Sequence, residues 1–257
     1  MENLNIIIVT QARIGSSRFP EKVLKPLGNS TMLGIHLNRL NQAKLATKII
    51  VATTFEDKSS EIIAIANNNN AQAFQGSTTD VLDRFYQAVL PHNPEIIVRV
   101  TSDCPLIDAN LIDNVINLLI QKKLDYAANI LIEAFPDGQD VEVFTFEALK
   151  TAWKNATLPS DREHVTPYIR KNCDFNGGNL FKAQNFDSSK SYNAIRMTVD
   201  EPKDLATIQL LIDKLGTDKT WLEYASFIEK NTSIILNQEI VRNEGYLKSL
   251  ISDNNEQ

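Results

Sequence analysis

The run Asn5-Ile6-Ile7-Ile8-Val9-Thr10 decides the fold, because it is an unbroken apolar stretch of strand length that is rich in β-branched residues. Such a run is typical of a strand that is covered on both faces. Two similar runs follow at Lys48–Thr54 and Glu95–Thr101, and helical patterns separate the runs at 31–43, 59–68 and 79–89. This alternation predicts the α/β class, with a mostly parallel central sheet and helices on both faces.

The second half of the chain repeats these patterns less regularly. We expect further strands at Leu124–Asn129, Asp140–Thr145 and Ala194–Val199, and further helices near 203–215, 219–230 and 237–250. The turn signal Phe135-Pro136-Asp137-Gly138 stands where the rhythm changes. This change predicts a lobe built onto the first half of the chain, and not a second independent domain.

Composition excludes several classes of partner. The 257 residues carry a net charge of −6 with a pI near 5.2, so general electrostatic binding to nucleic acid is not expected. No apolar run approaches ~18 residues, and the N-terminus lacks a basic region and a small-residue cleavage site. We therefore expect a cytoplasmic protein without a membrane partner. Cys104 and Cys173 lack the spacing of a zinc site or of a disulfide framework.

The segment Gln11-Ala-Arg-Ile-Gly-Ser-Ser-Arg-Phe-Pro-Glu-Lys22 directly follows the first strand. Ligands of open α/β sheets bind at the carboxyl ends of strands, so this loop is a candidate phosphate site. Residues 11–25 have a local charge of +3, from Arg13, Arg18, Lys22 and Lys25 against Glu21. The loop is neither a Walker A motif nor a dinucleotide fingerprint. A solvated basic loop is the alternative interpretation.

Two aspartates follow strand-like runs and precede prolines. Asp103 comes after the run 95–101, and Asp200 comes after the run 194–199. Carboxylates at neighbouring strand ends would converge on one Mg²⁺ together with phosphate oxygens, which is the usual way in which this ion binds. Each aspartate alone could instead cap a helix.

Five motifs, in order, resemble the cytidylyltransferase superfamily that activates acidic sugars, especially its spore coat polysaccharide (SpsF-type) branch. They are the loop 11–24, Gly76-Ser-Thr-Thr-Asp80-Val-Leu-Asp-Arg84, Arg99-Val-Thr-Ser-Asp103-Cys-Pro105-Leu-Ile-Asp108, Ser160-Asp-Arg-Glu-His-Val-Thr-Pro-Tyr168 and Arg196-Met-Thr-Val-Asp200-Glu-Pro202. The resemblance covers about residues 5–215 and implies a single Rossmann-like (GT-A-like) nucleotidyltransferase domain. It also implies transfer of CMP from CTP to a small anionic acceptor, with release of pyrophosphate.

The resemblance assigns roles to individual residues. Arg13 and Lys22 would hold the triphosphate with help from Arg18, while Asp103 and Asp200 would hold Mg²⁺. Arg13, Lys22, Asp103 and Asp200 are thus the candidate catalytic residues. The remaining nucleotide contacts would come from Gln11, Ala12, Gly15, Ser16, Gly76, Asp80, Val81, Arg84 and Thr101. For Asp80 the alternative is to complement the dipole of a helix that Ser77 or Thr79 caps.

Acceptor binding is assigned to two further groups. Arg162, Glu163 and His164 concentrate titratable side chains at a predicted helix start. Asp140 and Glu142 alternate on one face of a predicted strand and would meet hydroxyl groups of the acceptor, although a solvated strand edge is the alternative.

The expected domain organisation follows these assignments. A nucleotidyltransferase domain at 1–216 would comprise a nucleotide-binding half at 1–129, a substrate and dimerisation lobe at 130–195, and the metal-site strand and helix at 194–216. A helical extension with a frayed tail would follow at 217–257. The resemblance also implies a homodimer.

Two rival functions remain open. A nucleotide-sugar-dependent glycosyltransferase would share the nucleotide, the metal and the α/β sheet, but such enzymes commonly carry an Asp-x-Asp pair, and Ser102-Asp103-Cys104-Pro105 offers one carboxylate. A non-catalytic nucleotide-binding module is the other rival, because a fold can outlive its chemistry. The combination of Lys22, Asp103 and Asp200 favours an enzyme.

Overall fold

The computed structural model describes residues 4–16, 18–240 and 242, and within them one seven-stranded sheet forms the centre of the molecule. The strand order is β5-β4-β1-β6-β8-β7-β9, and β8 alone runs antiparallel to its neighbours. The strands are β1 (Ile6–Gln11), β4 (Lys48–Thr54), β5 (Gln72–Gly76), β6 (Ile96–Thr101), β7 (Tyr126–Ala128), β8 (Glu142–Thr145) and β9 (Ala183–Asn185). A small antiparallel ribbon joins β2 (Pro26–Leu27) to β3 (Ser30–Thr31).

The first strand is buried on both faces, as its apolar run predicts. Ile6 and Ile8 belong to one hydrophobic cluster and Ile7 and Val9 to the other, and none of the four is more than 3% exposed. Burial of this kind removes each of these side chains from water and stabilises the fold by about 1.5–3 kcal/mol apiece. Because β4 and β6 flank β1 in parallel, the carboxyl ends of these three strands meet at one edge of the sheet.

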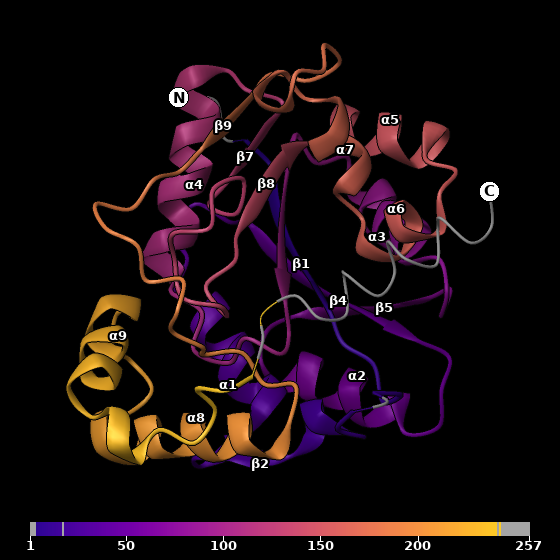
Figure 1. Ribbon diagram of the computed structural model, residues 1–257. Helices are drawn as coiled ribbons and strands as arrows, with labels where there is room; N and C mark the ends of the chain where they lie inside the picture. Colours follow the sequence, from indigo (N-terminus) through magenta and orange to yellow (C-terminus); the bar gives the residue numbers. More distant parts are fainter. Residues whose placement is uncertain (1–3, 17, 241, 243–257) are drawn as a thin grey trace.

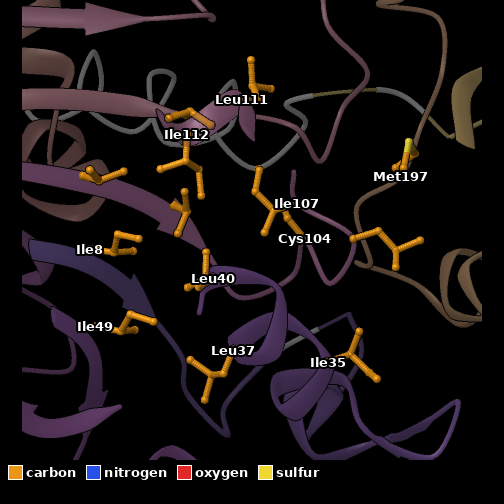
Figure 2. Close-up of a cluster of buried hydrophobic side chains, with 14 of the residues drawn as sticks. Ile8, Ile35, Leu37, Leu40, Ile49, Cys104, Ile107, Leu111, Ile112 and Met197 are labelled. Atoms are coloured by element: carbon orange, nitrogen blue, oxygen red, sulfur yellow. The ribbon is translucent and has the colours of Figure 1, made fainter. Parts of the chain in front are cut away.

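Helices cover both faces, with α3, α5, α6 and α7 together on one side and α4 on the other (Figure 1). Apolar residues of α1, α2, α4, α8 and α9 belong to the first cluster, whose members from α1 and α4 face those of β1 and β4 in Figure 2. The helices are α1 (Met32–Leu40), α2 (Ser59–Asn68), α3 (Val81–Val89), α4 (Ala109–Lys122), α5 (Phe146–Asn155), α6 (Pro159–His164), α7 (Pro167–Asn172), α8 (Pro202–Leu215) and α9 (Trp221–Lys230). Short 3-10 turns lie at Lys22–Leu24, Leu90–His92, Asp174–Asn176 and Thr232–Ile234.

One predicted strand is wrong. The segment Ala194–Val199 belongs to no strand and makes one isolated bridge, between Asp137 and Arg196, because its backbone bonds to two separate loops. Asp137 pairs with both Ile195 and Met197, while the amide of Val199 donates to the carbonyl of Asp103 at 2.8 Å. The segment therefore ties the loop after β6 to the loop before β8.

Residues 130–195 are not set apart from the sheet, since they supply β8 and β9 to it and α5–α7 to one of its faces. The predicted helix at 237–250 is not formed at 237–240, and nearly all the rest of it lies outside the described residues, as does the tail 252–257. Among the described helices, none is long and apolar enough to cross a membrane.

Candidate active site

The two aspartates predicted as metal ligands lie together at the carboxyl edge of the sheet, and Lys22 joins them. The ammonium of Lys22 is 3.0 Å from Asp103 Oδ2 and 2.8 Å from Asp200 Oδ1, and it also donates to the carbonyl of Val199 at 2.8 Å. Asp103 follows β6, and Lys22 begins the 3-10 turn that ends the basic loop. Residues 22, 103 and 200, distant in sequence, thus form one cluster.

The opposite charges in this cluster stabilise one another. Burial opposes the charge of Lys22, but the two carboxylates outweigh it, so the pKa of the ammonium is raised. Burial likewise opposes the charge of Asp103, but Lys22 and hydrogen bonds from Thr101 and Cys104 outweigh it and hold the pKa of the carboxyl well below its usual range. Lys22 and Asp103 are therefore both ionised at neutral pH, and the ammonium of Lys22 lies between the carboxylates of Asp103 and Asp200.

The same geometry suits a divalent cation. Two carboxylates that share one ammonium within 3.0 Å have the oxygen donors and the spacing that a hard cation needs. The described residues contain no group of three or more acidic, histidine or cysteine ligands, so other oxygens must complete the coordination. Phosphate oxygens and water are the usual partners of Mg²⁺ in such sites.

The basic loop is folded against this cluster. Arg18 pairs with Asp200 Oδ2 at 3.0 Å, and the amides of Ser16 and Glu21 both donate to the carbonyl of Ile14. Gly15 lies so close to Glu56 that a Cβ there would be 2.4 Å from the Glu56 carboxylate. Arg13 and Gly15 are exposed at the edge of the sheet, so a ligand has access to the loop.

The predicted base and ribose contacts surround the ends of β1 and β5. Gln11 ends β1, and its buried Oε1 has no hydrogen-bond partner among the described residues.

Arg84 is 2% exposed and packs against Gly76, where a Cβ would be 2.9 Å from Arg84 Cγ. Burial and the nearby charge of Arg13 lower the pKa of Arg84 to about 10. The charges of Arg13 and Arg84 thus oppose each other, an arrangement that an anionic nucleotide would relieve. Ala12 and Val81 are buried, and Thr101 ends β6.

Asp80 and Arg162 bind each other. Arg162 donates through Nε at 2.9 Å and Nη2 at 2.5 Å to Asp80 Oδ2, while Asp80 Oδ1 accepts from the amide of Asp83. Asp80 is therefore itself the N-cap of α3, and the alternative in which Ser77 or Thr79 caps this helix is wrong. Ser77 Oγ instead accepts from the amide of Asp80 at 3.0 Å.

The other predicted acceptor residues are dispersed. Glu142 is 1% exposed, and its carboxylate accepts from Tyr126 and Thr166 at 2.6 Å each and pairs with Arg99. Asp140 pairs with Arg242 at 2.7 Å. Glu163 and His164 were predicted at a helix start, but they lie in the last turn of α6, with 3.9 Å between Glu163 Oε2 and His164 Nε2.

Sequence reasoning missed the residues that hold Asp200. Arg196 bonds to Asp137 at 2.7 Å, to both oxygens of Asp204 and to Asp200 Oδ2 at 3.4 Å. Asp204 in turn accepts from the amide of Asp200 at 2.9 Å. Their spacing in the sequence could have identified them, because Arg196 stands four residues before Asp200 and Asp204 four residues after it.

Fold and site together define a nucleotidyltransferase, because a cationic loop after the first strand faces two carboxylates at the same sheet edge. Its family follows from the sequence. Residues 6–240 match the model of the cytidylyltransferase family, and the chain belongs to that family of CTP-dependent enzymes.

Individual relatives agree with this assignment. The spore coat polysaccharide biosynthesis protein SpsF of Bacillus subtilis is 30% identical over 91% of this chain and 98% of its own length. The structure of a cytidylyltransferase from Leptospira borgpetersenii is 33% identical, covers 93% of this chain and 100% of its own, and has a TM-score of 0.85. A CMP:2-keto-3-deoxy-manno-octonic acid synthetase complexed with CTP shares the fold, with a TM-score of 0.61 at 17% identity over 82% of this chain and 99% of its own.

Proposed function

We propose that this enzyme transfers CMP from CTP to a small acidic sugar of the 3-deoxy-ulosonic or nonulosonic type, or to a phosphonate, and releases pyrophosphate. The observation that carries the proposal is the convergence of Lys22, Asp103 and Asp200 at one point of the sheet edge. Relatives named for octulosonate activation and for spore coat polysaccharide support an acidic sugar and a role in glycan precursor synthesis.

Asp103 and Asp200 would hold Mg²⁺. The bound ion would screen the charge of the α-phosphate and orient an in-line attack on it. Lys22 then exchanges its two carboxylate partners for phosphate oxygens, because a flexible ammonium moves readily between anions. No dedicated general base is required of the chain.

The remaining cations would hold the nucleotide. Arg13 and Arg18 take the triphosphate with Lys22 and stabilise the departing pyrophosphate, since guanidinium groups bind phosphate in a forked geometry. Gln11 and Arg84 lie beside the base and ribose, with Gly15, Ser16, Gly76, Asp80, Val81, Ala12 and Thr101 completing the contact surface.

Asp140, Glu142, Arg162, Glu163 and His164 remain the proposed acceptor contacts. Arg162 carries the permanent positive charge of this group, and its side chain has to share or release Asp80 before it can bind an anionic acceptor. We also propose a cytoplasmic homodimer that uses residues 130–195, on the resemblance to the family.

A pyrophosphate-release assay tests the function. The protein is incubated with CTP, Mg²⁺ and a panel of ulosonic acids, nonulosonic acids and phosphonates. Release is expected with one acceptor class and should be lost in Asp103→Ala and Asp200→Ala. Normal turnover in either variant contradicts the metal assignment, and UDP-sugar hydrolysis without CTP-dependent release favours a glycosyltransferase.

A further inference from the structure

We propose that Asn237, in the segment 235–242, is a positioning residue for the catalytic carboxylate of Asp200, acting through Asp204 and Arg196. The inference rests on the proposed metal role of Asp200 and extends it to a part of the chain that the five motifs do not include. Asn237 lies 37 positions beyond Asp200 in the sequence and does not touch it.

Asp204 is the anchor of the loop that carries Asp200. It is fully buried, and its Oδ2 accepts from the amides of Asp200 and Glu201 at 2.9 and 3.0 Å and from Arg196 at 3.0 Å. Its Oδ1 accepts from Arg196 Nε at 2.9 Å. The orientation of this carboxylate therefore sets both the backbone of Asp200 and the guanidinium that contacts the Asp200 side chain.

Asn237 supplies the remaining hydrogen bond to this anchor. Its amide donates to Asp204 Oδ1 at 2.8 Å and lies 3.5 Å from the carbonyl of Arg196. The side chain is 1% exposed, so the bond is shielded from water. A buried carboxylate depends on every donor that it has, because an unmet lone pair there costs more than the bond itself contributes.

The neighbours of Asn237 hold it in place. Ile235 is 9% exposed and belongs to the first hydrophobic cluster, which also contains Ile6 and Ile8. The backbone amide of Leu236 donates to the hydroxyl of Thr207 in α8 at 3.3 Å. Arg242 then donates to the carbonyl of Phe135 at 3.1 Å and to Asp140 at 2.7 Å. The segment thus spans from α8 to the loop before β8.

That loop is itself fixed to the catalytic segment. Asp137 pairs with Arg196, and Gly138 lies directly against the backbone of Met197 and Thr198. The segment 235–242 therefore holds the Asp200 loop from two sides, at Asp204 and at the loop 135–140. Loss of the Asn237 amide lets Asp204 and Arg196 rearrange, and a carboxylate displaced by even a fraction of an ångström binds a metal less well.

Metal binding distinguishes positioning from simple stabilisation. The affinity for Mn²⁺ in the presence of CTP is measured by electron paramagnetic resonance of the free ion, without any acceptor. Asn237→Leu, which keeps the volume but removes the donor, should weaken Mn²⁺ binding about tenfold or more. Asn237→Ala is the second variant if the leucine does not fold. The matched control is Asn185→Ala, because Asn185 is also buried, at 3%, and donates to an aspartate, Asp187, at 2.7 Å.

The control should lower the melting temperature and leave Mn²⁺ affinity within about twofold. Equal losses of Mn²⁺ affinity in the Asn237 and Asn185 variants, or an unchanged affinity in the Asn237 variants, would overturn the positioning role alone. Asp200→Ala is measured in parallel. If it binds Mn²⁺ as tightly as the wild type, the proposed metal site is wrong, and the role of Asn237 fails with it.

Discussion

Arg162 of α6 donates two hydrogen bonds, from Nε and Nη2, to one oxygen of Asp80, whose other oxygen caps α3. The pair joins residues 82 positions apart and ties the segment after α5 to the nucleotide-binding half. One side chain thus serves as a helix cap and as an ion-pair partner, and these two roles can be separated by mutation.

Asp80→Asn keeps the cap and removes the charge, whereas Asp80→Ala removes both. We expect Asp80→Ala to cost about 1 kcal/mol more in the free energy of unfolding than Asp80→Asn. A double-mutant cycle with Arg162→Met should give a coupling of about 1 kcal/mol or less, because both side chains are partly exposed. Urea unfolding measures all of these values. Equal losses in the two Asp80 variants would show that the cap contributes nothing.

If Asp103 and Asp200 hold Mg²⁺ as proposed, the ion competes with Lys22 for the same two carboxylates. Without Lys22, Asp103 and Asp200 repel each other, so Lys22→Met should melt at a lower temperature than wild type. Added Mg²⁺ should raise the melting temperature more in Lys22→Met than in wild type, because the ion no longer displaces an ammonium. Thermal melts with and without Mg²⁺ provide the measurement. The control is Lys58→Met, since Lys58 pairs with Glu21 on the surface. A Mg²⁺ response equal in both variants would argue against the shared site.

Gly138 is required by its backbone and by its neighbours. Its φ is 103°, and a Cβ would lie 2.6 Å from the backbone of both Met197 and Thr198. Gly138→Ala should therefore lose about 3 kcal/mol or more, of which strain at positive φ accounts for roughly 1 kcal/mol. Gly177→Ala is the control, because Gly177 has a φ of 85° and open space around its missing Cβ. The difference between the two variants in chemical denaturation isolates the collision, and equal losses would exclude it.

His36 makes stability depend on pH. It is fully buried between the hydroxyl of Thr10 and the carbonyl of Cys104, and burial lowers its pKa from 6.5 to about 4. The unfolded chain therefore takes up a proton first, and stability falls as the pH drops from 6.5 towards 4. Between pH 7.5 and 5.0 this group costs about 2 kcal/mol.

His36→Gln should be less stable at pH 7.5 but should lose about 2 kcal/mol less than wild type on going to pH 5.0. Urea unfolding at the two pH values tests this difference. His92→Gln, at a more exposed histidine whose pKa burial and Lys48 lower without a large shift, should change the pH dependence much less than His36→Gln. An unchanged pH dependence in His36→Gln would mean that the histidine is protonated equally in both states.

The sequence predicted the sheet best where a strand is buried on both faces. The run Lys48–Thr54 is β4 to the residue, because an unbroken apolar run leaves little choice of structure. Ala194–Val199 has a similar composition but forms no strand, since its bonding partners are single residues of two loops. The pattern of apolar residues indicates that a segment is buried, but it does not indicate which other segment its backbone will hydrogen-bond to.

The candidate site was predictable to the same degree. Placement after β6 predicted the position of Asp103, and the basic loop after β1 predicted that of Lys22. Asp200 contacts Lys22 at the same edge although the strand predicted before Asp200 is not formed. The mutual contact of Asp80 with Arg162 was not predictable, because nothing local indicates which charges pair across 82 residues. The burial of Glu142 was not predictable either. The alternation of residues shows on which face of a strand a side chain lies, but it does not show which residues cover that face.

The three central residues of the site stand at positions 22, 103 and 200, and Asn237 follows them. During synthesis, a ribosome therefore releases the phosphate loop long before the partner carboxylates exist. A nascent chain with only residues 1–129 folded presents Lys22 and Asp103 without Asp200, and the three residues come together only after residue 200 has emerged. A product truncated before residue 200 would thus lack one of the two carboxylates of the proposed metal site.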